Sequence, residues 1–339
     1  MRSLIVAPPS LADAVMVQPL VALLGRLDPE GRVEVLADAA LAPLFAAMPG
    51  VAATIAAREL AGPLRPWGLA RLARRVAASR PDRAFVLDAS RRAALVLRLA
   101  RVPQRVGPAP PAGTGPDAGP ASRRPPVERF ALLAFDPAHP PPGPVPDPVL
   151  RRDPRAEAAA LDRAGLAPGT RLLALCVAAD GARRRRWPAR HWASLIALAA
   201  AACPELEPVL VGDAADRAFA TEIAALSGRP LRNLCGRQPL GDAIATLAQA
   251  EAVAAHDCGL MHVAAAYSRP MVAVFGPTDP RWAPPRSARA RVQWLAGGCR
   301  ACDATACGAG QARCTAGVAP GAVFRALLGT MRFAAPGIR

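Results

Sequence analysis

Residues 252–285, which read AVAAHDCGLMHVAAAYSRPMVAVFGPTDPRWAPP, decide the fold of this chain. An apolar run at 252–255 ends in a turn that begins with His256, and a helical pattern then carries His262 one turn in. A second apolar run, 271–275, stops at a Gly-Pro-Thr turn. This alternation predicts a parallel sheet, and both loops would then open at its carboxyl edge, where open α/β folds bind ligands.

The turn between the first strand and the helix has the features of an anion site. Asp257, Cys258 and Gly259 lead into the helix, whose first N–H groups lack helical partners and whose dipole favours negative charge. The hypothesis is therefore nucleotide binding through a pyrophosphate. The alternative is structural: Asp257 caps the helix, and His262 fills its buried face.

Both segments closely resemble motifs of one family, D-S-G-L-M-H-V-A-A-A and G-P-T-x-P of the ADP-heptose:lipopolysaccharide heptosyltransferases. The resemblance is specific over 257–266 and 275–285, covers most of the chain in weaker form, and is closest to the second heptosyltransferases of that family. It implies an α/β fold of the GT-B type, in which two doubly wound Rossmann-like domains face a cleft.

The length of the chain agrees with two domains. At 339 residues it exceeds the size at which a single core usually keeps growing, and the Pro-rich stretch 137–154 predicts an extended connector. The expected domains are 1–150 and 151–339. By the resemblance, the first binds the acceptor, and the second binds the nucleotide sugar and ends in a Cys-rich loop, 299–314, and a terminal helix.

Apolar periodicity predicts the elements of both halves. Strands are expected at 3–7, 33–36, 84–87, 105–107, 172–176, 208–211, 231–235, 252–255 and 271–275. Helices are expected at 13–27, 39–48, 66–78, 91–99, 189–202, 215–226, 241–248 and 323–331. Residues 108–126, rich in Pro, Gly and Ala, are expected to form a mobile loop.

The charge of the chain favours anionic partners. All 42 basic residues are arginine, and the net charge is +16. Sugar nucleotides, phosphorylated lipid A and the anionic inner leaflet are candidate partners. A nucleic-acid-binding protein is disfavoured, because only 4% of the residues are aromatic and a basic surface studded with aromatic side chains is not evident.

The apolar segments predict a cytoplasmic protein. None reaches the roughly 18 residues that a membrane-spanning helix needs, and the apolar segment in the start, MRSLIVAPPS, is too short for a signal peptide. A peripheral position on the cytoplasmic face of the inner membrane is the open alternative.

A carboxylate at the first strand-to-helix loop is the candidate general base. In the heptosyltransferases this loop reads S-x-G-D, which implies Asp13 as the base and Ser10 as part of the donor site. Ala12 occupies the usual Gly of that motif. The alternative is an Asp13 that only interacts with its helix dipole.

The remaining donor residues also follow from the resemblance. Residues 183–188, RRRRWP, align with a K-R-W-P motif whose Lys contacts donor phosphates, so Arg185 would take that place. Asp216 resembles an acidic position that contacts the ribose, with helix capping as an equal alternative. The full expected donor set is Ser10, Arg185, Asp216, Asp257, Cys258, Gly259, His262, Gly276 and Thr278. Arg123 and Arg124 are expected either to meet acceptor phosphates or to form a solvated pair.

Four cysteines cluster near the end of the chain with the spacing C-x2-C-x4-C-x6-C. Cys299, Cys302, Cys307 and Cys314 lie in a Gly-rich segment, and such clustering in a cytoplasmic chain favours metal over disulfides. Four thiolates could hold a structural zinc or an iron–sulfur cluster, with ordinary thiols as the alternative.

The expected activity is that of an inverting glycosyltransferase. By the resemblance it would move heptose from ADP-heptose onto an inner-core lipopolysaccharide precursor of the heptosyl-Kdo2-lipid A type, and catalysis would need no cofactor. The chain departs from the family pattern at Ala12, Val177, Arg185 and Cys258. Two alternatives therefore stay open: a different nucleotide-sugar donor, and a catalytically weak protein that only binds nucleotide or lipid.

Overall fold

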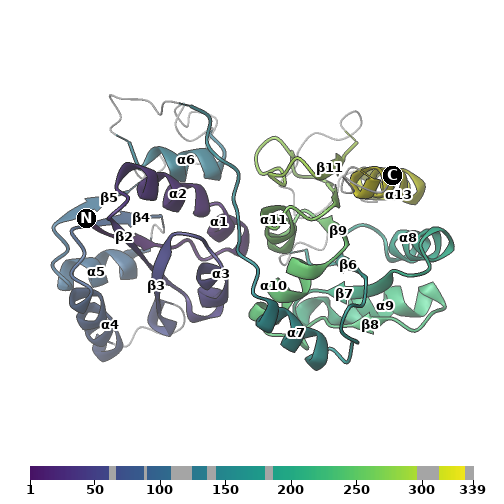
Figure 1. The fold of residues 1–339 in the computed structure, drawn as a ribbon, viewed down its shortest axis with the longest axis horizontal. Coiled ribbons are helices and arrows are strands. Elements are labelled where there is room, and N and C mark those ends of the chain that lie inside the picture. Colours follow the sequence, from purple (N-terminus) through teal and green to yellow (C-terminus); the bar gives the residue numbers. More distant parts are fainter. Residues whose placement is uncertain are drawn as a thin grey trace. The chain divides into compact units, whose positions relative to one another are not determined.

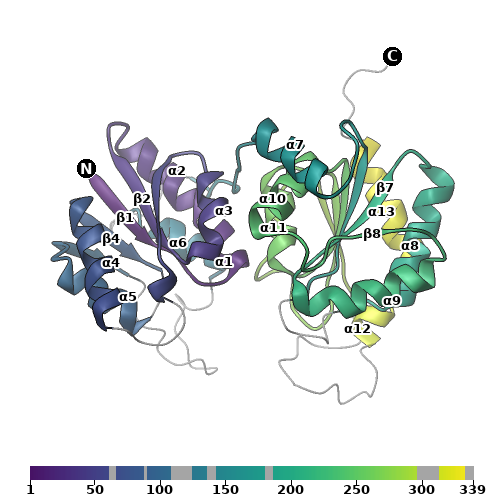
Figure 2. The ribbon, with the colours of Figure 1, turned by 90° about the horizontal axis from the view of Figure 1, so that it is seen from below.

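The computed structural model describes most of the chain, which divides into two compact units, Met1–Arg151 and Arg152–Arg339. Each unit contains one parallel sheet with helices on both faces (Figures 1 and 2). The described residues are 1–60, 66–87, 90–107, 124–135, 143–179, 186–295 and 313–332. The segment 108–123, most of the loop expected at 108–126, lies outside them.

The first sheet has the order β3-β2-β1-β4-β5, with every neighbouring pair parallel. Its strands are β1 (Arg2–Val6), β2 (Arg32–Ala37), β3 (Val51–Ala56), β4 (Arg83–Val86) and β5 (Gln104–Val106). The central β1 is buried from its second residue, Ser3, and apolar from its third. The order reverses at β1, because the chain moves first to β2 and β3 on one side and then to β4 and β5 on the other.

The helices of the first unit cover both faces of this sheet (Figure 2). They are α1 (Leu11–Val15), α2 (Gln18–Leu27), α3 (Ala42–Ala46), α4 (Pro66–Ala78), α5 (Arg91–Leu99) and α6 (Pro126–Leu132), with 3₁₀ turns at Ala39–Leu41 and Arg58–Leu60. The limits of α4 and α5 agree with the sequence prediction. Both helices bury leucine and valine side chains against β1, β2 and β4.

One prediction for this unit was wrong, and two of its elements, β3 and α6, were not expected. A single helix was expected at 13–27, but α1 ends at Val15 and α2 begins at Gln18. Pro19 explains the break, because its ring clashes with the carbonyl four residues earlier and it has no N–H to donate. The strand β3 was not expected, since VAATIA is only half-buried along its length and lacks a strong apolar alternation.

The second sheet has the order β11-β10-β9-β6-β7-β8, again parallel throughout. Its strands are β6 (Leu172–Cys176), β7 (Glu207–Val211), β8 (Arg232–Asn233), β9 (Ala252–His256), β10 (Met271–Val274) and β11 (Ala290–Gln293). β6 and β9 lie side by side in the middle and are buried at every residue. The strand order reverses between them.

The helices of the second unit are α7 (Pro154–Arg163), α8 (Ala189–Ala202), α9 (Arg217–Ser227), α10 (Leu240–Gln249), α11 (Gly259–Ala266), α12 (Arg313–Ala316) and α13 (Pro320–Arg332), with a 3₁₀ turn at Ala214–Asp216. The terminal α13 packs on α8 and β10. Among the described residues, no helix is long and apolar enough to cross a membrane.

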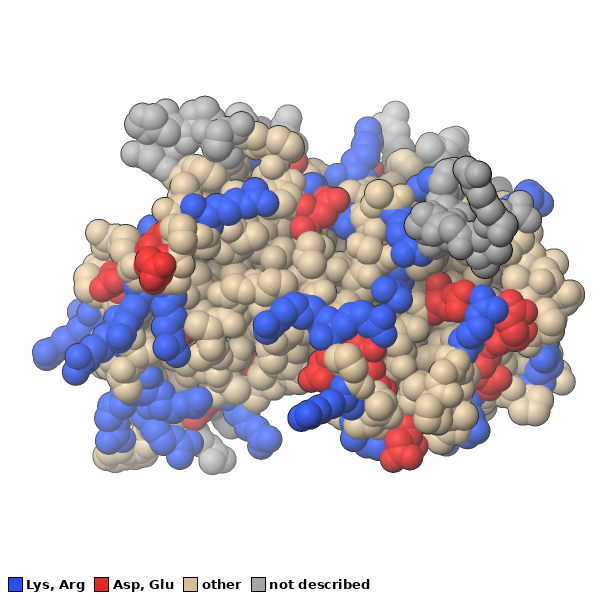
Figure 3. All heavy atoms as spheres, in the orientation of Figure 1, with Lys and Arg blue, Asp and Glu red and all other residues tan. Residues whose placement is uncertain are grey.

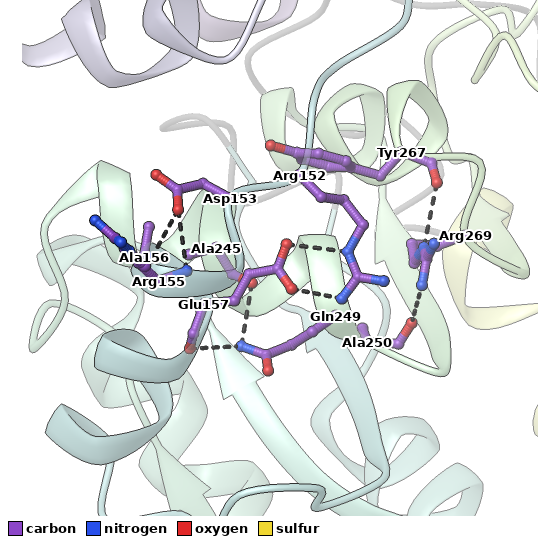
Figure 4. Close-up of polar contacts among 10 residues, drawn as sticks. All are labelled: Arg152, Asp153, Arg155, Ala156, Glu157, Ala245, Gln249, Ala250, Tyr267 and Arg269. Atoms are coloured by element: carbon purple, nitrogen blue, oxygen red, sulfur yellow. Dashed lines mark hydrogen bonds and ion pairs between the residues drawn. The ribbon is translucent and has the colours of Figure 1, made fainter.

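The helix α7 was not expected, and it fixes the start of the second unit (Figure 4). Asp153 is its N-cap, and Pro154 occupies the first helical position. The Arg152 guanidinium donates two hydrogen bonds to the buried carboxylate of Glu157, and the Gln249 amide donates to the Glu157 carbonyl at 3.0 Å. These contacts tie the first residues of the unit to α7 and α10.

Candidate functional site

The reversal of strand order between β6 and β9 marks the place where this sheet can hold a ligand. In doubly wound sheets the crevice for a nucleotide lies outside the carboxyl ends of the two strands that flank such a reversal. The loop after β6 begins at Val177, and the loop after β9 begins at Asp257. The two segments that the sequence singled out for phosphate binding therefore leave adjacent strands at the same edge.

His256, the last residue of β9, joins these two loops and was not among the predicted site residues. Its Nε2 accepts the backbone N–H of Trp187 at 2.6 Å and the indole N–H of Trp192 at 3.2 Å. Its Nδ1 lies 3.2 Å from the carbonyl oxygen of Ala178. An imidazole that accepts at Nε2 must be neutral, with its proton on Nδ1, so Nδ1 donates to Ala178.

The environment of His256 keeps the ring neutral. The side chain is fully buried, and its ring lies edge-on to that of Trp192, with the two ring centroids 5.0 Å apart. Burial lowers the pKa of His256 to about 4, because the apolar surroundings disfavour the charged imidazolium. The carbonyl acceptors oppose this shift and the nearby Arg186 adds to it.

The segment between Ala178 and Trp187, the two residues whose backbones bond to His256, contains the predicted phosphate contact. Ala178 precedes it and Trp187 follows it, so one imidazole holds both flanks. Arg185, in the segment 180–185, lies outside the described residues. Its neighbour Arg186 is described, and its guanidinium makes contacts within the protein. It forms an ion pair with Asp216 at 2.8 Å and lies over the ring of Phe219.

Asp216 lies at the turn into α9 and is 3% exposed. Its carboxylate accepts from Arg186 and, at 3.2 Å, from the backbone N–H of Asp213 in a capping box. Burial raises the pKa of Asp216, and the Arg186 hydrogen bond opposes that rise. The capping alternative is thus present in the structure, while a ribose contact stays a prediction.

A short hydrogen bond connects the two loops of the motif region. The Thr278 hydroxyl donates to the Asp257 carboxylate at 2.6 Å. Asp257 is 9% exposed and precedes Cys258, which is the N-cap of α11. The loop after β9 and the loop after β10 are therefore held together at the carboxyl edge, beside the N-terminus of α11, whose residues, His262 included, are all buried.

Gly276 is required by packing. A Cβ at this position would lie 2.4 Å from Cγ2 of Thr315, in α12. The Trp294 indole donates to the Gly276 carbonyl at 3.2 Å, which fixes the same turn from β11. The expected donor contact at Gly276 remains a prediction. In the structure, glycine is needed at this position because α12 leaves no room for a side chain.

In the first unit, the candidate base sits at the carboxyl end of β1. Ser10 is the N-cap of α1, and its hydroxyl donates to the Asp13 carboxylate at 2.9 Å while accepting the Asp13 N–H at 3.1 Å. Both side chains reach solvent. Arg124 is exposed just before α6, whereas Arg123 lies outside the described residues.

The structure describes only the last member of the cysteine cluster. Cys314 is buried in α12, and Cys299, Cys302 and Cys307 lie outside the described residues. Among the residues that the structure does describe, no group of three or more His, Cys, Asp and Glu side chains could hold a metal ion.

Comparison with solved structures identifies the class. ADP-heptose lipopolysaccharide heptosyltransferase II of Escherichia coli is similar, with a TM-score of 0.82 and 27% identity over 98% of this chain and 99% of that one. An E. coli heptosyltransferase solved with ADP has the same fold, with a TM-score of 0.67 and 21% identity over 97% and 100%. The predicted fold class, GT-B, is confirmed.

Sequence comparison identifies the family. Residues 69–312 match glycosyltransferase family 9 (heptosyltransferase). Lipopolysaccharide heptosyltransferase 2 of Salmonella typhimurium is 33% identical over 311 residues, which are 86% of this chain and 87% of the relative. The chain belongs to glycosyltransferase family 9, and the predicted enzyme class is confirmed.

Proposed function

We propose that this chain is an inverting glycosyltransferase that moves heptose from ADP-heptose onto an inner-core lipopolysaccharide precursor of the heptosyl-Kdo2-lipid A type. The observation that carries the proposal is the pair of loops after β9 and β10, which Asp257 and Thr278 join beside the reversal of strand order between β6 and β9. The names of the relatives, which are heptosyltransferases that act on lipopolysaccharide or lipooligosaccharide, support the choice of sugar and acceptor.

The second unit would bind the donor and stabilise the leaving group. Negative charge develops on the ADP diphosphate as the bond to the sugar breaks. The N-terminus of α11 at Gly259 and the guanidinium of Arg185 are the groups proposed to receive that charge, and the Thr278 hydrogen bond fixes the loop beside the N-terminus of α11. No divalent metal is needed in this scheme.

The first unit would bind the acceptor and hold the base. The acceptor hydroxyl attacks the anomeric carbon from the face opposite to ADP, its proton passes to the Asp13 carboxylate, and ADP leaves with the bonding electron pair. One displacement of this kind inverts the anomeric configuration. The Ser10 hydroxyl, which donates to the same carboxylate, would orient it for proton transfer.

A combined binding and turnover experiment tests the proposal. Titration calorimetry with ADP and ADP-heptose measures donor affinity, and a transfer assay with the core precursor measures activity. Binding with transfer supports the proposal. Transfer from another nucleotide sugar but not from ADP-heptose would replace the donor, and nucleotide binding without any transfer would identify a catalytically weak paralogue.

Two further features belong to the proposal. The four cysteines would hold a structural zinc or an iron–sulfur cluster, because thiolates at this spacing suit a tetrahedral site. The protein would work at the cytoplasmic face of the inner membrane as a peripheral protein, because its acceptor is a lipid and its net charge of +16 is attracted to anionic headgroups.

A further inference from the structure

The positive charge of the first unit is concentrated in one part of its chain. Residues 58–107 contain 12 arginines and 3 acidic residues, a net charge of +9. The other residues of 1–151 contain 7 arginines and 9 acidic residues, a net charge of −2. A uniform preference for arginine over the whole chain does not produce this difference, so the local excess calls for a partner.

The helices α4 and α5 carry much of this charge on one surface. They pack against each other, and their buried leucine and valine side chains face β1, β2 and β4. Their other sides are exposed. On α4, Trp67 and Arg74 lie seven residues apart on one exposed face, and the Trp67 side chain is 88% exposed.

The exposed side of α5 continues the same mixture of residues. Arg91 and Arg98 are exposed, and between and beside them Leu95 and Leu99 are 43% and 52% exposed. Figure 3 shows arginines gathered where Figure 1 places α4 and α5. We define the α4–α5 face by six residues: Trp67, Arg74, Arg91, Leu95, Arg98 and Leu99.

The arginines of the α4–α5 face are available to an outside partner. In the part of the chain that the structure describes, Arg74, Arg91 and Arg98 form no ion pair. Their neighbour Arg71 differs, since it pairs with Glu59 at 3.2 Å. Three guanidinium groups therefore face solvent together with an indole and two leucine side chains.

We infer that the α4–α5 face docks on an anionic bilayer surface. Guanidinium groups bind lipid phosphates, and a Trp with nearby leucines enters the boundary between headgroups and acyl chains. A single-stranded nucleic acid would instead need several aromatic side chains on which its bases stack, and this face has only Trp67. The inference rests on the proposed function only in that a lipid acceptor gives the protein a reason to approach a membrane.

The two kinds of side chain predict two components of binding. Each arginine near an anionic leaflet strengthens binding about fivefold, so the three together contribute on the order of a hundredfold at low ionic strength. Salt screens this component. The Trp67 and leucine component depends on apolar burial and should persist at high salt.

The test measures binding of the full-length chain to vesicles by co-sedimentation. Phosphatidylcholine vesicles with and without phosphatidylglycerol separate the charge component from the apolar one. Arg74→Glu should weaken binding to the anionic vesicles at least tenfold, and Trp67→Ser should remove most of the binding that survives in high salt. The matched control is Arg26→Glu, an exposed arginine on α2 at the opposite face of the sheet (Figure 2), which should change binding less than twofold.

Several outcomes would overturn the inference. They are failure of the unaltered protein to bind anionic vesicles, equal weakening by Arg74→Glu and Arg26→Glu, and displacement of the vesicles by an oligonucleotide that binds through the same arginines. The proposed function is measured separately: Arg74→Glu should keep the ADP affinity and the turnover with a deacylated, water-soluble acceptor. If the protein binds vesicles with this pattern but transfers no heptose, the docking of the α4–α5 face on a bilayer is supported and the proposed function is rejected.

Discussion

At the scale of single residues, Asp13 carries the chemistry of the proposal. Replacement of Asp13 by Asn removes the proton acceptor but keeps a side chain that can still bond to Ser10. We expect turnover to fall by about 10² or more, the usual contribution of a general base, while the ADP affinity stays the same. Steady-state kinetics and calorimetry on the same preparation measure both. Unchanged turnover would leave Asp13 as a residue of the first turn of α1 that only bonds to the N-cap Ser10.

Arg185 is the residue on which phosphate binding depends in the proposal. Replacement of Arg185 by Ala should weaken ADP binding by about 1.5–3 kcal/mol, the range for hydrogen bonds between charged groups. Arg183→Ala and Arg184→Ala are the matched controls, because neither side chain is proposed to contact a phosphate, and each should change the free energy of ADP binding by only a few tenths of a kcal/mol. Arg185→Lys separates a point charge, which would restore affinity, from use of the two-pronged guanidinium, which would not. Equally small effects at positions 183, 184 and 185 would show that Arg185 makes no phosphate contact.

His256 makes the stability of the second unit depend on pH. Burial lowers its pKa from the ordinary 6.5 to about 4, so between these values the unfolded chain binds a proton that the folded chain excludes. Stability should therefore fall as the pH is lowered from 6.5 to 4, by on the order of 2–3 kcal/mol.

The control for this prediction is His256→Asn, which lacks the titrating ring. The variant should be less stable at pH 7, because Trp187 and Ala178 lose their shared partner. The difference between the two proteins in the free energy of unfolding, measured with urea, should become smaller toward pH 4.5. A difference in the free energy of unfolding that stays constant from pH 7 to 4.5 would contradict the low pKa of His256.

At the scale of elements, the packing of the loop after β10 on α12 is the contact that is open to the sharpest test. Gly276→Ala would place a Cβ 2.4 Å from Cγ2 of Thr315, so the loop or α12 must move, at a cost of about 1–3 kcal/mol. Thr315→Ser removes that methyl group, and the next heavy atoms, Sγ of Cys314 and Cβ of Thr315, lie 3.7 and 3.8 Å from the added Cβ. The double variant should recover much of the lost stability.

A double-mutant cycle with thermal unfolding measures this coupling. Gly329→Ala is the control, because a Cβ there meets no atom within 4 Å and alanine favours the interior of α13 by up to about 1 kcal/mol over glycine. Additive effects of Gly276→Ala and Thr315→Ser would show that the two residues do not touch.

At the scale of the whole molecule, the cysteine cluster predicts the metal content of the protein. Elemental analysis of a preparation that has never met an affinity-resin metal should find about one zinc, or iron with visible absorbance. Removal of the metal should lower the melting temperature, because binding to the folded state alone stabilises that state. Metal-free protein with an unchanged melting temperature would leave the four cysteines as ordinary thiols.

The sequence by itself determined the alternation of elements and the two motif loops. Strands such as β6 are continuous apolar runs, and helices such as α4, α5 and α8 have a regular apolar spacing, so local pattern suffices to predict their limits. Among the elements that were missed, β3 and β11 lie at sheet edges, and α6 and α12 are short helices. The helix α7 was missed because its Asp-Pro start lies within the Pro-rich stretch that was expected to be an extended connector.

The tertiary structure alone decided which polar residues meet. His256 is 69 residues from Trp187 and 78 from Ala178, and Thr278 is 21 residues from Asp257, so no local pattern reports these contacts. They arise because parallel strands bring loops that are distant in sequence to one edge of a sheet. Burial then fixes the neutral ring of His256 and the partner of Asp216, since a polar group removed from water must find its hydrogen bonds within the fold.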